Sequence, residues 1–306
     1  MKITRTKAIF VLCVSLVMNI PVFAQDLEPR RWTQLPVGMT VVGAGYGHTY
    51  GDLLFDPLME VESAEVKVDA LAVSYVRSFA LAGKVARFDA VVPWKSAHWE
   101  GLLRGEPASV KREGFADPRF RLSLTLLNSS ENKSAETSHT KVSQATNTVV
   151  GAAIAVRVPL GEYYEDKLLN LGENRFMIRP QIGIVHTRGP WSYELTGSIF
   201  FFTDNDDFFN GNSREQDPIY ALQAHVIHTF KPGYWASLSA GYGLGGRSSV
   251  NGELKDDEWG NVMSALSAGF PVAKNQSVKV VYLYAKTQKF TGSITDTLGF
   301  AWSIRF

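Results

Sequence analysis

The chain has almost no cysteine: its single copy, Cys13, lies in an N-terminal segment that we expect to be removed. Residues 1–24 begin with a basic stretch, continue with an apolar run and end in Val22-Phe23-Ala24, as a secretory signal peptide does. The apolar run, residues 8–20, is shorter than the roughly 20 residues that a spanning helix needs. The exported protein therefore has no thiol for a disulfide, a metal thiolate or a nucleophile.

An excess of charge of either sign is also missing. Removal of the three basic residues Lys2, Arg5 and Lys7 leaves 28 of the 31 basic residues, against 30 acidic ones. Nucleic-acid-binding domains usually carry a strongly basic surface. The sequence therefore predicts no nucleic-acid partner.

Long apolar runs are absent after residue 37, so the sequence does not predict a membrane protein built from helices. Apolar and polar residues instead alternate at period two, in blocks separated by Gly, Pro, Asn and Asp, which is typical of β-strands. Twelve strands are predicted, near 37–49, 65–77, 83–95, 115–127, 146–158, 174–187, 190–203, 217–230, 233–246, 259–271, 274–287 and 294–306.

The connections between these blocks differ in length along the chain. Those after alternate strands are long and polar, as at 204–216 and 247–258, whereas others shrink to a few residues, as at 231–233 and 272–275. Long loops on one rim and tight turns on the other are the layout of an outer-membrane barrel. The sequence therefore predicts an all-β protein, an antiparallel up-and-down transmembrane barrel of about 12 strands in the bacterial outer membrane.

One connection departs from this rule. Residues 128–145 are polar and rich in Ser and Thr, although by strand count they should form a short periplasmic turn. One interpretation is a disordered insertion, which loops tolerate at small entropic cost. The alternative is a missed or split strand nearby, which would change the strand count.

The chain ends in "LGFAWSIRF", an alternating strand with its apolar residues on one face. A strand that faces lipid needs such a face, and closure of the barrel satisfies its backbone polar groups. The pattern resembles the C-terminal signal that outer-membrane proteins present to the barrel-assembly machinery. We therefore predict that Phe300, Trp302, Ile304 and Phe306 form an assembly signal.

Several charged residues lie at the alternate strand positions that we expect to point inward. The basic ones are Lys67, Arg77, Arg87, Arg119, Arg121, Arg157, Arg179 and Arg305, and the acidic ones are Asp69, Asp89 and Glu194; His225 shares this face. In one interpretation they pair across strands and fill a narrow lumen. In the other, unpaired guanidinium groups line a path that favours anionic solutes. Arg119 and Arg121 are the strongest candidates for that path.

Catalytic and metal-binding patterns are scarce. No histidine is followed by the x-Ser step of outer-membrane phospholipases on a strand, and His225 and His228 fall on opposite strand faces. The acidic stretch at 204–211 has Phe208 where a calcium loop needs a ligand. The sequence predicts neither an enzyme, nor a metal site, nor a cofactor.

Three stretches carry a family resemblance: "AVVPW" at 90–94, "GFADPRFRLSLTLL" at 114–127 and "RVPLGEY" at 157–163. With them the chain resembles the family named for the MetA pathway of phenol degradation, whose members are often labelled as transporters. The resemblance implies an outer-membrane barrel that handles small, often aromatic, hydrophobic compounds.

Taken together, the sequence predicts a signal peptide (1–24), a short periplasmic segment (25–36) and a barrel (37–306). The expected function is passive uptake of small organic compounds, aromatic or anionic hydrophobic ones among them, by a monomer in contact with outer-membrane lipids and lipopolysaccharide. One alternative is a plugged barrel that serves as a structural or adhesion scaffold, because twelve strands give an intermediate lumen. A lipid-modifying enzyme is the third possibility.

Overall fold

A computed structural model describes residues 27–55, 61–129 and 146–306. The expected signal peptide lies outside these residues, as do residues 130–145 of the long polar connection. Among the described residues no helix is long and apolar enough to cross a membrane.

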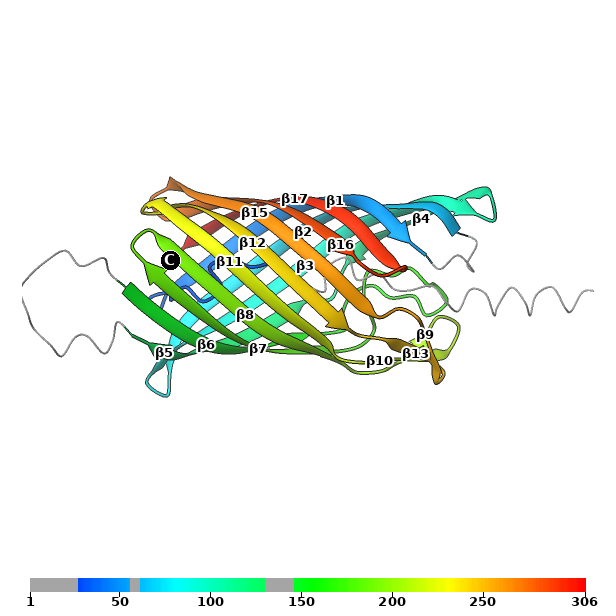
Figure 1. Ribbon diagram of the computed structural model, residues 1–306, viewed down its shortest axis with the longest axis horizontal. Helices are drawn as coiled ribbons and strands as arrows, with labels where there is room; N and C mark the ends of the chain where they lie inside the picture. Colours follow the sequence, from blue (N-terminus) through cyan, green and yellow to red (C-terminus); the bar gives the residue numbers. More distant parts are fainter. Residues whose placement is uncertain (1–26, 56–60, 130–145) are drawn as a thin grey trace, which may run out of the picture.

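The described chain forms a closed antiparallel barrel of 12 strands (Figure 1). Its wall consists of β1 (Thr40–Leu54), β2 (Val61–Leu81), β3 (Lys84–Leu103), β4 (Glu106–Phe115), β5 (Arg119–Asn128), β6 (Thr146–Arg157), β7 (Met177–Arg188), β8 (Trp191–Phe202), β11 (Ile219–Lys231), β12 (Tyr234–Gly245), β15 (Trp259–Ala273), β16 (Gln276–Thr287) and β17 (Gly292–Arg305). Pairing of β1 with β17 closes the sheet. β4 and β5 occupy one position in the wall, because both pair with β3. The predicted fold and strand count are confirmed.

The alternating apolar and polar residues of the sequence lie on opposite faces of the wall. Residues directly opposite each other on neighbouring strands share a face, which places Leu71, Trp94, Leu122 and Ile154 outside. Large apolar residues on this face are strongly exposed, and Ile182 and Leu238 are both 59% accessible. Such a band suits the hydrocarbon of a membrane, so the protein is an outer-membrane barrel.

The two ends of the barrel differ as the sequence predicts. One end carries the tight turns and the C-terminus, and the other carries the long connections, on the right of Figure 1. The connections contain strands that the sequence did not reveal, namely β9 (Asn205–Phe208), β10 (Asn212–Gln216), β13 (Ser248–Val250) and β14 (Glu253–Leu254), which form a small sheet. The connection between the predicted strands 83–95 and 115–127 is instead the end of β3 and its hairpin with β4. In barrels of this type the tight turns face the periplasm.

The wall is interrupted between β4 and β5. Residues 116–118 belong to neither strand, and in the described part of the chain no strand pairs with the second edge of β4. Residues 158–162 lie there instead, since the N–H of Val158 donates to Pro118 O (3.0 Å) and that of Glu162 donates to Phe115 O (2.8 Å). This part of the wall is therefore held by far fewer backbone bonds than the rest.

The N-terminal segment corrects one prediction. Residues 27–35, which the sequence places in the periplasm, contact the inner wall of the barrel, because the backbone turns inward below β1. We call residues 27–36 the plug. The reason for the difference is chemical: the segment carries apolar and charged side chains that find buried partners on β3, β5 and β8.

Candidate functional site

The plug fills the middle of the lumen. Leu27 packs against Met263 and Ala265, and Trp32 packs against Val149 and Val185, so that both plug residues are only 6% exposed. Beside Arg31 and Trp32 a cavity of only about 30 Å³ remains, room for one or two water molecules. The lumen is therefore closed by a separate segment and not by wall side chains alone.

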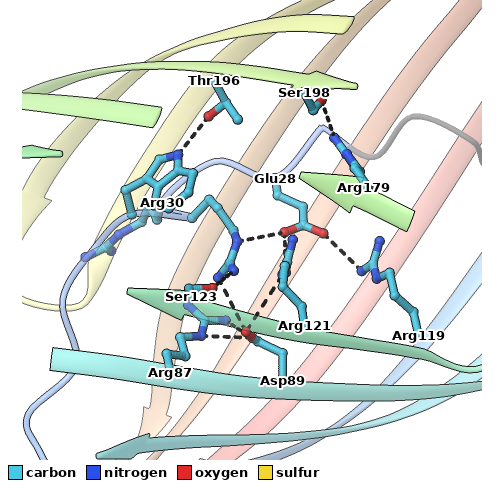
Figure 2. Close-up of polar contacts among 12 residues, drawn as sticks. Glu28, Arg30, Arg87, Asp89, Arg119, Arg121, Ser123, Arg179, Thr196 and Ser198 are labelled. Carbon is cyan, nitrogen blue, oxygen red and sulfur yellow. Dashed lines mark hydrogen bonds and ion pairs between the residues drawn. The ribbon is translucent and has the colours of Figure 1, made fainter. Parts of the chain in front are cut away.

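Glu28 of the plug is bound by arginines of β5 (Figure 2). Its Oε1 lies 3.0 Å from Arg119 Nη2, and its Oε2 lies 2.7 Å from Arg121 Nη2. Arg31 Nε is 3.8 Å from the same Oε2. One carboxylate therefore bridges two guanidinium groups of the wall, an arrangement stronger than a neutral hydrogen bond.

Asp89 of β3 forms a second centre next to the first. Arg87 Nε donates to its Oδ1 at 2.8 Å, while Arg31 Nη1 and Arg121 Nε lie 3.5 Å and 3.8 Å from its Oδ2. Arg31 also donates to Ser123 Oγ. The predicted lumen residues Arg87, Asp89 and Arg121 thus form one network, and the plug supplies its remaining partners.

Trp32 occupies a socket built from two glycines. Gly151 of β6 and Gly183 of β7 are direct partners across the sheet. A Cβ at Gly183 would lie 1.9 Å from Trp32 Nε1, and one at Gly151 would lie 2.5 Å from Trp32 Cε3. The indole N–H donates to Thr196 Oγ1 at 2.8 Å. The wall therefore accepts the indole only because these two side chains are missing.

The side chain of Glu194 on β8 binds the backbone of the plug. The N–H of Arg30 donates to Glu194 Oε2 at 2.8 Å, and the Arg30 guanidinium lies 5.4 Å from the ring centroid of Trp235. Arg30 has φ of 65°, a left-handed conformation that costs a residue with a Cβ roughly 1–3 kcal/mol. His225 is opposite Glu194 in the register and bonds Ser239 through Nδ1 at 2.7 Å. Both predicted inner residues therefore face the lumen.

Arg157 and Arg179 also point inward but lie outside the Glu28 contacts. Arg157 Nη2 is 2.6 Å from Glu173 Oε2, in the connection before β7. Arg179 donates to Ser198 Oγ at 3.3 Å, and its guanidinium lies 4.4 Å from the ring centroid of Phe200. The inner arginines are therefore divided between three acidic partners, Glu28, Asp89 and Glu173, and a stacked position.

Three other predicted inner residues are on the outer face. Lys67, Asp69 and Arg77 share strand parity with the lipid-facing Leu71 of β2, and Lys67 and Asp69 form exposed ion pairs with Glu100 and His48. The prediction from strand parity was wrong here because β2 extends beyond the apolar band that faces lipid. Outward-facing side chains there contact water and are polar. Arg305 shares the inner parity through its partner Val41, but it donates to Lys274 O in a turn at the barrel end.

The C-terminal residues have the expected arrangement. Phe300 and Trp302 oppose Tyr46 and Ala44 on the outer face, and they are 46% and 39% exposed. Trp302 Nε1 donates to Gln276 Oε1 at 2.9 Å. Phe306 exchanges backbone hydrogen bonds with Thr40 (2.8 and 3.2 Å), so the chain is paired to its last residue.

A cavity of about 320 Å³ lies at the long-loop end, between the far ends of β1 to β4 and residues 166–169. Its lining is mainly apolar and includes Leu53, Phe55, Val61, Ala64, Trp99, Leu102, Leu103, Ala108, Val110, Leu168, Leu169 and Phe209. The charged lining residues are Glu65, Glu100, Arg104, Arg112, Asp166 and Lys167. Its volume is at the lower end of the range for small-molecule sites.

Glu28 and Glu173, which bind these arginines, remain ionised. Burial disfavours the charged form of Glu28, but the guanidinium groups of Arg121 and Arg31 outweigh burial and hold its pKa well below the ordinary value. Burial likewise opposes ionisation of Glu173, yet Arg157 and Arg175 lower its pKa to about 2. Among the described residues no group of three His, Cys, Asp or Glu side chains is placed to hold a metal.

The motifs "DPR" and "PLGEY" meet in space. Asp117 Oδ1 accepts the N–H of Gly161 (2.9 Å) and its Oδ2 accepts that of Glu173 (2.9 Å). The aspartate thus fixes residues 158–173 beside the interruption of the wall.

Residues 60–301 match the family described as "Putative MetA-pathway of phenol degradation". The chain belongs to this family.

An outer membrane channel of known structure shows the same fold. This member of the phenol-degradation family is 20% identical to an outer membrane channel from Pseudomonas putida F1, with a TM-score of 0.75, over 92% of this chain and 100% of that one. A monoaromatic hydrocarbon channel, CymD, gives a TM-score of 0.46 at 10% identity, over 95% and 94% of the two chains. The translocator domain of the autotransporter NalP from Neisseria meningitidis gives 0.48 at 12% identity, over 90% and 91%. No curated protein matches the sequence.

The residues that sequence reasoning missed are in the plug. Glu28, Arg31 and Trp32 supply three of the central contacts, yet "LEPRRW" has no strand periodicity. An available signal was composition, because two arginines and a tryptophan are unusual in a short segment intended for the periplasm.

Proposed function

We propose that this protein is an outer-membrane channel for passive uptake of small, largely apolar organic compounds. The observation that carries the proposal is the apolar cavity of about 320 Å³ at the long-loop end. Mainly hydrophobic lining with a few polar groups is typical of sites for small organic molecules. Family membership and the fold support a role in membrane passage.

The plug determines how passage must occur. A solute held in the cavity meets the plug in the middle of the lumen, where the space beside Arg31 and Trp32 measures only about 30 Å³. Two routes follow from the structure: displacement of the plug, or exit beside β4, where the wall has few backbone bonds. Displacement of the plug breaks mainly side-chain contacts, whereas exit beside β4 breaks the few backbone bonds that join residues 158–162 to Phe115 and Pro118.

A plugged structural barrel is the second candidate, favoured by the small residual cavity beside the plug. Against it, a scaffold has no need of an apolar cavity at its outer end.

We also propose that the protein is a monomer, that lipopolysaccharide surrounds its outer end and that the barrel-assembly machinery inserts it.

Uptake of N-phenyl-1-naphthylamine tests the proposal, because intact lipopolysaccharide excludes this neutral aromatic compound and its fluorescence rises in an apolar environment. Cells that express the protein should take it up faster than cells with an empty vector. The substitution Ala108→Trp should slow uptake, because the indole would fill the cavity. Ala90→Trp on the outer face of β3 is the matched control. Equal uptake with and without the protein would reject the channel.

A further inference from the structure

We propose that Arg119 and Arg121 form a carboxylate-binding site of the channel, which Glu28 of the plug occupies in the closed state. A solute carboxylate competes with Glu28 for these two residues and loosens the plug. This inference rests on the proposed function, since loosening of the plug matters only in a barrel that conducts.

The charges of the site favour an anion in the position of Glu28. Five guanidinium groups, those of Arg31, Arg87, Arg119, Arg121 and Arg179, surround the two carboxylates Glu28 and Asp89. Arg31 Nε and Nη1 and Arg121 Nε face carboxylate oxygens only at 3.5–3.8 Å, too long for a hydrogen bond, and among the described residues Arg179 Nε has no acceptor. A carboxylate that replaces Glu28 therefore enters a site with an excess of positive charge and with buried donors that are not fully bonded.

The wall side of the site is built independently of Glu28. Arg119 and Arg121 lie on β5, which pairs with β3 through Val91 and Asp89 and with β6 through Arg157 and Ala155. None of these backbone pairs involves the plug. Departure of Glu28 would thus leave the two guanidinium groups in place.

The occupant, in contrast, is exchangeable. Glu28 precedes the regular strands, and the backbone of the plug makes few bonds to the wall, among them Arg30 N–H to Glu194 and the Ser78 hydroxyl to Pro36 O. Glu28 is held through its side chain by the contacts with Arg119, Arg121 and Arg31. A carboxylate of equal charge satisfies the same two wall residues.

The geometry selects a monocarboxylate of small size. Each oxygen of Glu28 contacts a different guanidinium group, so the site holds one planar carboxylate between two arginines. The Trp32 socket is at the level of Thr125, four residues along β5 from Arg121, or about 13 Å at the rise of a strand. A single-ring aromatic acid therefore competes with Glu28 and not with the indole.

Calorimetric binding of benzoate to the purified barrel tests the site directly. Glu28→Gln removes the internal competitor, so benzoate should bind at least about tenfold more tightly than to the wild type. Arg121→Gln should abolish binding, and benzamide, which is uncharged, should not bind to any variant. Unchanged benzoate affinity in Glu28→Gln, or retained binding in Arg121→Gln, would overturn the proposal. Heat-modifiable mobility on gels establishes that each variant is folded.

A second measurement keeps Glu28 in place. The exported chain is expected to be free of thiols, so Pro29→Cys introduces one reactive group next to the carboxylate. Benzoate should accelerate its modification by a small thiol reagent, whereas benzamide should not; equal rates would contradict displacement. These assays need no transport. Failure of benzoate binding alongside active naphthylamine uptake would therefore reject this site and leave the channel intact.

Discussion

At the scale of single residues, the closed state depends on two plug side chains and their partners on the wall. The indole of Trp32 needs the missing side chains of Gly151 and Gly183, and the carboxylate of Glu28 needs Arg119 and Arg121. Both contacts join residues far apart in sequence: 91 positions separate Glu28 from Arg119, and 164 separate Trp32 from Thr196. Strand parity alone predicts the inward placement of Arg87, Arg119 and Arg121. Their partners could not be predicted, because the plug has no periodicity to place it.

The socket can be tested by filling it. In Gly183→Ala the new methyl group would overlap Trp32, whose nearest atom is 1.9 Å away, so the indole must leave and the plug should loosen. We expect higher single-channel conductance in planar bilayers. Gly197→Ala is the control, since no atom lies within 4 Å of a Cβ at that position. Equal conductance in both variants would show that the indole does not hold the plug.

The lowered pKa of Glu28 predicts how its contribution depends on pH. A carboxyl group with a depressed pKa in the folded state contributes stability above its ordinary value of 4.5 and loses it only as the pH falls through the folded pKa. The difference in conductance between the wild type and Glu28→Gln should therefore stay constant from pH 7 down to about pH 4.5. Measurement of both proteins across this range checks it. A difference that vanishes near an ordinary glutamate pKa would mean that the guanidinium groups do not hold the charge.

At the scale of strands and loops, the sequence predicts the wall well because lipid on one side enforces strict alternation. All twelve predicted strands are present, and only the ends of β1, β2 and β3 extend well beyond the predicted blocks. The strands β9, β10, β13 and β14 were not predictable, since they are two to five residues long and polar. Their pairing depends on neighbouring loops and not on a local pattern.

The orientation of the barrel is a prediction at this scale. Glu253 lies in a long connection and Lys274 in a tight turn, and both are exposed. A cysteine at Glu253 should react with a membrane-impermeant thiol reagent in intact cells, whereas one at Lys274 should react only after the outer membrane is opened. The reverse pattern would invert the topology.

Assembly depends on the last strand. Deletion of Phe306 removes an exposed aromatic side chain and the backbone bonds to Thr40 that complete the β1–β17 seam. We expect less folded barrel in the outer membrane and more precursor in the periplasm, measured by heat-modifiable mobility on gels. Substitution of Phe230 is the comparison, because this residue is similarly exposed but lies on β11, away from the C-terminal strand. Unchanged assembly after deletion would remove the role that we assign to the C-terminal residue.

At the scale of the whole molecule, the structure combines an apolar cavity at one end with a closed lumen in the middle. The wall does not close itself: it leaves space that the plug fills with Leu27, Glu28, Arg31 and Trp32. A wall that served only as a scaffold could fill that space with its own side chains. The separate segment is therefore the feature that closes the lumen.

The central claim is that the barrel is a conduit closed by residues 27–36. The most direct test is the single-channel conductance of a variant that keeps residues 1–26, with the expected signal peptide, but lacks these ten residues, compared with the wild type. We expect a folded barrel with a stable conductance well above that of the wild type. A folded barrel whose conductance equals that of the wild type would contradict it.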